Sequence, residues 1–484
     1  MRPRLELLDA PLLQRVLDEA FALLRDRGVR ITAPRVLELL RAAGAEASGD
    51  VVRLPESLIR KSLATAPHEF FLYDRAGRPA VRYGGDAVHF DPGSSCLNIL
   101  DAATGRPRPA LAADLVRLVQ VAEALPQYAA QATALVCNDV PSEVGDLYRL
   151  LLVLWHADKP VVTGAFSAAG LAPMLELLAA ASGGSAALRA KPRAIFDVCP
   201  SPPLHWSDFA ALNLVDLAAA GVPAEIISVP MAGATAPVTL AGAVTQHAAE
   251  CLAGIAIHQC ASPGAPVVWG TAAAIFEMRA GIAPFGAIET AMLAVACAQV
   301  GKALGLPTHA YLVASDSRLV DAQAGMESAV SATLGALAGI NMISGAGMLD
   351  SLACHSVEKL VIDAEAIASA QRLLAGIEAR GDTLATAAFA QAGPAGDFLR
   401  AAETRALFRS EQHFPSAVIE RGVPPSEAAT PADTFARAAA RVTELLAEYK
   451  QPELPSEMAA AMRAIVEREG ARHGLTGLPG IAHR

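Results

Sequence analysis

The feature of this sequence that most constrains its fold is a regular alternation of two kinds of segment. From residue 87 onward, short runs rich in β-branched residues alternate with longer apolar runs that have helical spacing. The candidate strands are residues 88–91, 132–137, 160–164, 194–198, 224–229, 266–269, 308–313 and 340–344. The candidate helices are residues 112–124, 143–156, 170–181, 206–220, 239–259, 286–304, 322–337 and 357–377. Eight repeats of strand and helix predict an α/β fold with a parallel (β/α)₈ barrel.

The length of the alternating region favours a closed barrel over an open sheet. A doubly wound sheet also alternates strands and helices, but eight units over roughly 290 residues fit closure better. We therefore divide the chain into residues 1–86 (helices and a hairpin), residues 87–378 (the barrel) and residues 379–484 (a helical appendage). The hairpin is predicted from apolar runs on both sides of residues 75–78.

The composition excludes several classes of protein. Hydrophobic residues make up 53% of the 484 residues and charged residues 18%, which allows a large core and argues against disorder. The net charge of −10 argues against a nucleic-acid-binding protein. Because no stretch of ~18 uncharged apolar residues has the character of a membrane span, we expect a cytoplasmic protein without membrane association. The seven scattered cysteines include no C-x-x-C and support neither a disulfide framework nor a zinc ribbon.

The predicted barrel directs attention to the loops that follow its strands. In this fold the functional site lies at the carboxyl ends of the strands. Aromatic, charged, glycine and histidine residues near these ends are Phe90, Asp91, Phe166, Gly233, Trp269, Phe276, Arg279, Asp316, Arg318, Gly345, Gly347 and His355. We take these residues as the candidates for substrate and partner binding.

Longer motifs in the same loops resemble the trimethylamine methyltransferase family. They are P-M-A-G-A-T-A-P-V-T-L-A-G at residues 230–242, P-G-A-P-V-V-W-G-T-A-A-A-I-F-E-M-R-A-G at 263–281, S-D-S-R-L-V-D-A-Q-A-G at 315–325, and G-M-L-D-S at 347–351 followed by E-K-L-V-I-D at 358–363. Residues 100–106 and 159–166 also match, and the resemblance covers roughly residues 10–400 in consistent order. The motifs are specific for the family and less specific for a substrate.

The resemblance implies an activity and a partner. Members of the family transfer a methyl group from a methylated amine to the Co(I) of a separate corrinoid protein, which would dock over the barrel mouth. The archaeal trimethylamine enzymes carry pyrrolysine inside the barrel, whereas this sequence contains only the twenty standard residues. The chain is therefore identified as a non-pyrrolysine member that resembles glycine betaine methyltransferase, which implies a quaternary amine as methyl donor. We also expect a homo-oligomer and no bound metal.

Physical chemistry agrees with a quaternary amine as the substrate. Its nitrogen already carries a full positive charge and leaves as a neutral amine, so no residue has to supply a proton. Because this charge fades in the transition state, aromatic faces suit the cation better than a carboxylate pressed against it. We therefore predict an aromatic, weakly charged pocket formed by Phe90, Phe166, Trp269 and Phe276. An arginine fork would anchor a substrate carboxylate far from the reacting methyl group.

The candidates for substrate binding also have structural interpretations. Buried aromatic residues such as Trp269 usually fill the core. Arg279 and Arg318, which we predict as the carboxylate anchors, could instead form ion pairs with neighbouring acidic residues. Asp91 and Asp316 could accept hydrogen bonds from loop amides without contacting the substrate.

A second group of candidates is predicted to face the corrinoid. It consists of Gly233, Gly345, Gly347 and His355. Tight turns explain the glycines equally well, and a helix cap explains the histidine. Cys137, Cys199 and Cys354 could converge on a zinc ion, although their spacing gives no specific support for it.

Two other functions remain open at this stage. A sulfonium is also a charged leaving group, so a methyltransferase for a sulfonium or another methylated donor fits the same pocket. A non-catalytic homologue that binds a quaternary amine or the corrinoid protein fits too, because a fold does not fix a function. Residues 396–403 keep a G-x-F-L core but lack the histidines associated with this segment of the family, which leaves the substrate open.

Overall fold

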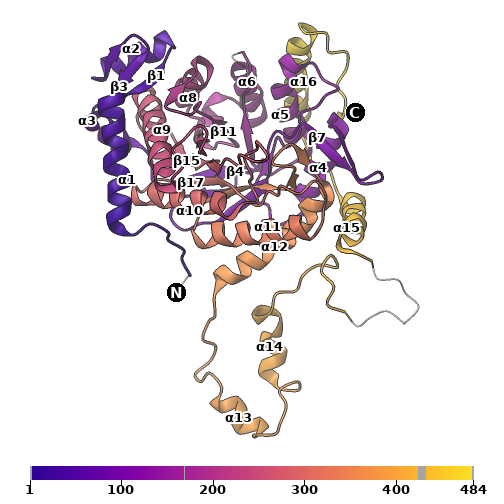
Figure 1. Cartoon of the computed structure of the whole chain (residues 1–484). Coiled ribbons are helices and arrows are strands. Elements are labelled where there is room, and N and C mark those ends of the chain that lie inside the picture. Colours follow the sequence, from indigo (N-terminus) through magenta and orange to yellow (C-terminus); the bar gives the residue numbers. More distant parts are fainter. Residues whose placement is uncertain (1–2, 168, 423–431, 482–484) are drawn as a thin grey trace.

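The computed structural model describes residues 3–167, 169–422 and 432–481, and its centre is a parallel eight-stranded barrel (Figure 1). The barrel strands are β6 (His89–Pro92), β9 (Gln131–Ala132), β10 (Val161–Gly164), β11 (Ala194–Val198), β13 (Ala224–Ser228), β15 (Val267–Thr271), β17 (Thr308–Tyr311) and β18 (Met342–Ala346). They pair in the order β6-β18-β17-β15-β13-β11-β10-β9. The amides of Ala129 and Cys96 donate to the carbonyls of Phe90 and Ala134, which joins the first strand to the second and closes the barrel. The predicted (β/α)₈ barrel is confirmed.

A helix follows each barrel strand and packs on the outside of the barrel. These helices are α4 (Ala112–Ala124), α5 (Gly145–His156), α6 (Leu171–Ser182), α8 (Asp208–Ala220), α9 (Leu240–Ala261), α10 (Ile288–Ala303), α11 (Ala322–Leu337) and α12 (Val357–Ala375). Four of them begin at side-chain caps that accept a backbone N–H, which are Ser207, Thr239, Asp321 and Ser356. The main difference from the prediction is β9, which is shorter because residues 134–136 pair with Cys96 instead of with β10.

The central helix α9 is both long and apolar. By length and composition it could cross a membrane, but 83% of its most apolar stretch is buried inside this protein. It lies between the barrel and the N-terminal helices, and Gly254 lets it approach the barrel closely. A Cβ atom at Gly254 would come within 2.5 Å of the Trp206 ring and 2.9 Å of Ile226. The apolar composition of α9 is therefore that of a core helix.

The N-terminal part of the chain packs against one side of the barrel. It consists of α1 (Ala10–Ala22), the π-helix η1 (Leu23–Arg27), β1 (Val29–Ile31), α2 (Pro34–Ala42), β2 (Glu46–Ser48), β3 (Val51–Arg53) and α3 (Glu56–Thr65). Strand β1 pairs with β3 and also with β12 (His205–Trp206) from the barrel region. Helices α1, α2 and α3 lie against α9, as the left side of Figure 1 shows.

A hairpin of β4 (Phe70–Tyr73) and β5 (Pro79–Tyr83) closes the end of the barrel where the strands begin. Its buried side chains Leu72, Val81 and Tyr83 form one apolar cluster with residues from inside the barrel. The barrel residues of that cluster are Val162, Ile195, Val268 and Met342. The predicted hairpin is thus the floor of the barrel, and the opposite end is left for a site.

Short elements decorate the loops at the carboxyl ends of the barrel strands. They are β7 (Asn98–Asp101), β8 (Arg106–Pro109), η2 (Ser142–Val144), β14 (Met231–Ala232), β16 (Ala274–Ile275), β19 (Met348–Leu349) and β20 (Cys354–His355). The order β19-β20-β7-β8 forms a small sheet, and β14 pairs with β16. One further short helix, α7 (Ser185–Ala190), follows α6.

The C-terminal helices divide into a docked pair and a projecting arm. Helices α15 (Thr434–Glu448) and α16 (Ser456–Ala471) pack against the barrel helices, α15 on α12 and α4 and α16 on α5 and α6. Residues 376–422 form an arm that extends away from the barrel in Figure 1. Its helices α13 (Thr386–Ala392) and α14 (Ala402–Glu411) contain no buried residue.

Candidate active site

Seven polar side chains meet inside the barrel, which we call the lumen cluster. They are Tyr83 from the hairpin, Asp91 from β6, Asp197 from β11, Glu225 from β13, His309 and Tyr311 from β17, and Ser344 from β18. Alternate residues of a strand share one face, so these residues point inward while their neighbours point toward the outer helices. The apolar neighbours on each strand are buried on its outer face, and this keeps the polar residue between them on the inner face.

Hydrogen bonds across the barrel show that the members of the lumen cluster are in contact. The Tyr311 hydroxyl donates to Asp197 Oδ2 at 2.9 Å. Nitrogen Nε2 of His309 lies 2.7 Å from the Ser344 hydroxyl, which donates to the carboxyl of Asp91. Tyr83 reaches up from the floor and donates to Glu225 Oε1.

Four buried atoms of the cluster have no hydrogen-bond partner in the protein. They are Asp91 Oδ2, Asp197 Oδ1, Glu225 Oε2 and His309 Nδ1. The last two lie 3.5 Å apart without forming a hydrogen bond. Because leaving a buried polar atom unpaired costs roughly 1–3 kcal/mol, their concentration in one place marks a binding site.

Burial controls the protonation of the lumen cluster. It raises the pKa of Asp91 and of Glu225 well above their usual values, with the charge of Asp197 adding to the effect on Glu225. Burial also raises the pKa of Asp197 to about 6 and lowers the pKa of His309 to about 3. Near neutral pH Asp197 is therefore mostly ionised while Asp91 and Glu225 hold their protons, and a cation that enters the lumen favours ionisation of these two carboxyls.

The lumen cluster is accessible from the mouth of the barrel. Glu225 and His309 are completely buried, whereas Asp197 and Tyr311 are partly exposed. Cys199, two residues beyond Asp197 toward the carboxyl end of β11, is exposed. A small molecule that enters at the carboxyl ends of the strands would thus meet Asp197 and Tyr311 first.

Among the predicted substrate-binding residues, Asp91 lies in the lumen and the large aromatics do not. Phe90 points to the other face of β6 and is buried in the main apolar core. Trp269 also faces outward, because its Nε1 donates to the carbonyl of Cys297 in α10. The lumen is therefore lined by carboxyls and tyrosines, and Phe90 and Trp269 do not contribute to it.

Two other predicted aromatics lie at the mouth. Phe166 is exposed, and its ring lies 5.4 Å below the guanidinium of the buried Arg149. The Phe166 amide donates to Asp146, which also pairs with Arg149. Phe276 is partly buried, and its amide donates to the carbonyl of Ala232 across the β14–β16 pair. The Phe166 ring lies beside Gly164, where a Cβ atom would come within 3.2 Å of the ring and 3.5 Å of Asp197 O.

The predicted polar anchors also lie at the mouth. Arg279 is exposed, and Arg318, whose side chain is 85% exposed, pairs with Asp350 at 3.0 Å. The Asp316 carboxylate accepts the amides of Phe285 and Gly286, both at 2.8 Å, so it shapes the loop. Asp316 and Arg318 line an open groove of about 770 Å³, where they could still meet the far end of a substrate.

The predicted corrinoid-facing residues divide into one on the rim and three inside. Gly233 has a φ of +97° and lies near the exposed side chains of the rim. Gly345 and Gly347 have φ values of +115° and +86°, and a Cβ atom there would come within 1.9 Å of Leu312 O and 2.1 Å of the His355 ring. Close packing explains these two glycines, against the backbone at Gly345 and against the His355 ring at Gly347. His355 is completely buried beneath Gly347, so it offers no surface to a docked corrinoid.

The cysteines do not form the zinc site that the sequence left open. Within residues 3–167, 169–422 and 432–481, the group of metal-binding side chains that lie close enough to share one ion is Asp197, Glu225 and His309. Their candidate ligand atoms all lie within 4.8 Å of one another. A metal site, if the protein has one, therefore belongs in the lumen.

Six members of the lumen cluster escaped prediction because they lie inside strands rather than in the loops after them. The signal was present in the sequence as single polar residues within apolar strands, such as Asp197 in A-I-F-D-V and Glu225 in A-E-I-I-S. A carboxylate within a buried parallel strand is costly unless it has a partner, so such a residue is a candidate for a site. The contribution of Tyr83 has no such signal.

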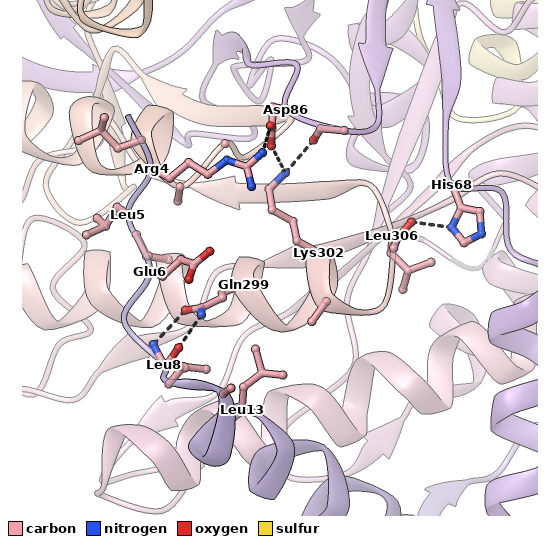
Figure 2. Close-up of a pocket in the computed structure, with 18 of the residues that line it drawn as sticks. Arg4, Leu5, Glu6, Leu8, Leu13, His68, Asp86, Gln299, Lys302 and Leu306 are labelled. Atoms are coloured by element: carbon pink, nitrogen blue, oxygen red, sulfur yellow. Dashed lines mark hydrogen bonds and ion pairs between the residues drawn. The ribbon is translucent and has the colours of Figure 1, made fainter. Parts of the chain in front are cut away.

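A second cavity, of about 830 Å³, lies at the opposite end of the barrel (Figure 2). Lys302 donates there to Gly85 O at 2.8 Å, and Arg4 pairs with Asp86. Gln299 accepts the amides of Leu7 and Leu8, both at 3.0 Å. These contacts fasten the N-terminal segment to the end where the strands begin, which in this fold serves stability rather than catalysis.

Comparison with known proteins identifies the family of this chain. A model of the trimethylamine methyltransferase family matches residues 1–474. The chain belongs to that family. Its relatives include a trimethylamine methyltransferase of Desulfitobacterium hafniense, 29% identical over 93% of this chain and 90% of the relative. They also include a glycine betaine methyltransferase of the same species, 29% identical over 98% of both chains.

An archaeal relative and a crystal structure are also similar to this chain. A trimethylamine methyltransferase of Methanosarcina mazei is 30% identical over 92% of this chain and 91% of the relative. The crystal structure of the monomethylamine methyltransferase of Methanosarcina barkeri covers 98% of this chain and 90% of that one, with a TM-score of 0.53 and 11% identity. At that identity the likeness concerns the fold. The protein is thus a methyltransferase of a family whose members act on methylated amines.

Proposed function

We propose that this protein transfers a methyl group from a quaternary amine to the Co(I) of a separate corrinoid protein. The observation that carries the proposal is the lumen cluster, which places ionisable carboxyls where a cation enters the barrel. The likeness to glycine betaine methyltransferase over the whole chain supports a quaternary amine. The corrinoid would supply a strong cobalt nucleophile at the mouth.

The residues of the lumen would position and stabilise the cation. Asp197, partly exposed and held by Tyr311, is the first carboxyl that a ligand meets. Because Asp91 and Glu225 hold protons near neutral pH, Asp197 supplies most of the negative charge that faces the cation. This limits the stabilisation of the bound ground state, whose charge must fade as the methyl group leaves.

The rim of the barrel supports a protein partner. Loops that follow five different barrel strands each carry a large exposed apolar side chain, and these are Leu97, Phe166, Val238, Met278, Ile282 and Leu319. Exposed apolar side chains that surround a site are typical of a protein-binding surface. A corrinoid protein that docks on this rim would bring its cobalt over the lumen.

The test is the methylation of Co(I) by the purified protein under reducing conditions, followed by absorbance. We expect turnover with a quaternary amine among glycine betaine, carnitine and proline betaine, and little with trimethylamine. Asp197→Asn should lower kcat/KM about 10- to 100-fold, because it removes a charged partner of the cation. Glu250→Gln is the matched control, since Glu250 is buried but bonded to Ser228 outside the cluster.

The same assay separates the rival functions. Turnover with a sulfonium and none with any quaternary amine would assign a different methyl donor to the same pocket. Calorimetric binding of a quaternary amine without cobalt methylation would indicate a binding protein. Equal activity of Asp197→Asn and Glu250→Gln would remove the lumen cluster from the mechanism.

We also propose that the protein is a homo-oligomer, with the arm as its main contact. The arm exposes the large apolar residues Ile377, Leu384, Phe389, Phe398, Leu399, Phe408 and Phe414. The barrel exposes a complementary apolar face on α10 and α11, formed by Ile288, Met292, Met326 and Val330. Because both halves belong to one chain, two copies can cover each other's surfaces with the same contact repeated twice.

A further inference from the structure

We propose that Asp197, Glu225 and His309 bind one divalent transition-metal ion inside the barrel, with zinc as the best match to the ligands. They come from strands β11, β13 and β17 on one side of the barrel. Zinc and related ions accept both imidazole nitrogen and carboxylate oxygen as ligands. The site goes beyond the proposed methyl transfer and is tested without it.

The distances fit a single ion. All three ligand atoms lie within 4.8 Å of one another, and His309 Nδ1 is 3.5 Å from Glu225 Oε2. Zinc binds nitrogen and oxygen at about 2.0–2.2 Å, which places ligand atoms around one ion about 3–4.4 Å apart. Small side-chain movements therefore suffice to close the site.

Each proposed ligand offers one free atom while its other polar atom is already held. Glu225 presents Oε2, and its Oε1 accepts the Tyr83 hydroxyl. Asp197 presents Oδ1, and its Oδ2 accepts the Tyr311 hydroxyl. His309 presents Nδ1, while its Nε2 bonds to Ser344. Metal ligands in proteins are oriented in this way by partners behind them.

A direct ion pair between His309 and Glu225 explains the arrangement less well. It would satisfy His309 Nδ1 and Glu225 Oε2 but leave Asp197 Oδ1 without a partner, and a hydrogen bond between the carboxyls of Asp197 and Glu225 would leave His309 Nδ1 without one. One cation between the three groups satisfies all three atoms and compensates the charge of two buried carboxylates.

Three protein ligands leave the ion open on one side. The open side would face the mouth, because Asp197 is partly exposed and the other two ligands are completely buried. Sites with three protein ligands and a free position are typical of catalytic zinc. A carboxylate or hydroxyl of a small molecule, such as the carboxylate of glycine betaine, could occupy that position.

The experiment measures metal binding by the full-length protein. The protein is dialysed against a chelator and titrated with Zn²⁺ by calorimetry, and the bound metal is counted by mass spectrometry. We expect one ion per chain in the lumen with a Kd below about 1 μM. Glu225→Gln and His309→Gln should each weaken this binding 100-fold or more, and Glu250→Gln should leave it unchanged.

Two further measurements keep the test decisive where a ligand variant folds poorly. Tyr83→Phe keeps the shape of the floor and removes only the hydrogen bond to Glu225, so it should weaken Zn²⁺ binding about 10- to 100-fold. Co²⁺ in place of zinc should give visible absorption bands in the wild type and not in His309→Gln. Absence of a stoichiometric ion, or equal binding by wild type and both ligand variants, would overturn the site.

Discussion

Two buried histidines on α9 make the stability of this fold depend on pH. His247 and His258 are completely buried, and burial lowers the pKa of His247 to about 4 and that of His258 to about 3. Their imidazoles are therefore neutral in the folded protein at neutral pH. In the unfolded chain a histidine takes up its proton near pH 6.5.

The consequence is a loss of stability in acid. Because the folded pKa lies below the unfolded value, the stabilisation is complete above pH 6.5 and is lost as the pH falls toward the folded pKa. The free energy of unfolding should fall by up to about 1.4 kcal/mol per pH unit for each histidine. His258→Asn should remove one of these contributions, measured as a shallower slope of urea-unfolding free energy between pH 7 and 5. Identical slopes in wild type and variant would contradict this.

At the same scale, the sequence predicted one member of the lumen cluster and missed the rest. Asp91 was found because it ends a strand, where barrel sites are expected. Asp197 and Glu225 lie within strands, and strand alternation alone says which face they share but not which distant residues they meet. Phe90 and Trp269 were expected in the lumen but face the outer helices. A large aromatic at a strand end can lie on either face, and the sequence alone does not say which.

The elements themselves follow from the sequence more directly than the site does. The eight strands and helices of the barrel were predictable because short runs rich in β-branched residues alternate with longer apolar runs of helical period. The pairs β14–β16 and β19–β20 were not, because they are two residues long and form where separate loops meet. These strands pair only once the barrel has closed and brought the loops together. A local sequence pattern does not contain that information.

Small residues set the distance between the outer helices and the barrel. Gly254→Ala in α9 should lower the free energy of unfolding by about 1–3 kcal/mol, since the new methyl group overlaps the Trp206 ring. Gly325→Ala in α11 is the control, because a Cβ atom there meets nothing within 4 Å. In that open position alanine should raise the free energy by up to about 1 kcal/mol through its higher helix propensity. Urea unfolding measures both, and a loss of stability in Gly325→Ala would contradict the argument.

On the scale of the whole molecule, the proposed contact between copies would cover the arm. An exposed helix without a buried face gains little from tertiary packing, and α13 and α14 are both short. Contacts between Phe389 and Phe398 and between Phe408 and Phe414 form small aromatic pairs within the arm, but these do not amount to a core.

The arm therefore predicts the state of the protein in solution. Light scattering at micromolar concentration should give an oligomer for the wild type and a monomer for the double variant Phe389→Ser, Phe408→Ser. Val330→Asp on the barrel face should have the same effect, because it places a charge in the proposed contact. Val51→Ser is the control, because Val51 is an exposed apolar residue of β3, which lies away from the arm in Figure 1. A monomeric wild type would refute the contact.

The position of Tyr83 has a consequence for the biosynthesis of the enzyme. Its hairpin is made before any barrel strand, yet it packs against Val268 and Met342, which are made near the end of the barrel. Its hydroxyl also holds Glu225, so the carboxylate is oriented only when the floor is in place. The hairpin therefore cannot complete its packing until the chain has been synthesised from Tyr83 to Met342, which is about 260 further residues. Assembly of the site is consequently a late event of synthesis, and a barrel expressed without its first 86 residues would lack part of its own chemistry.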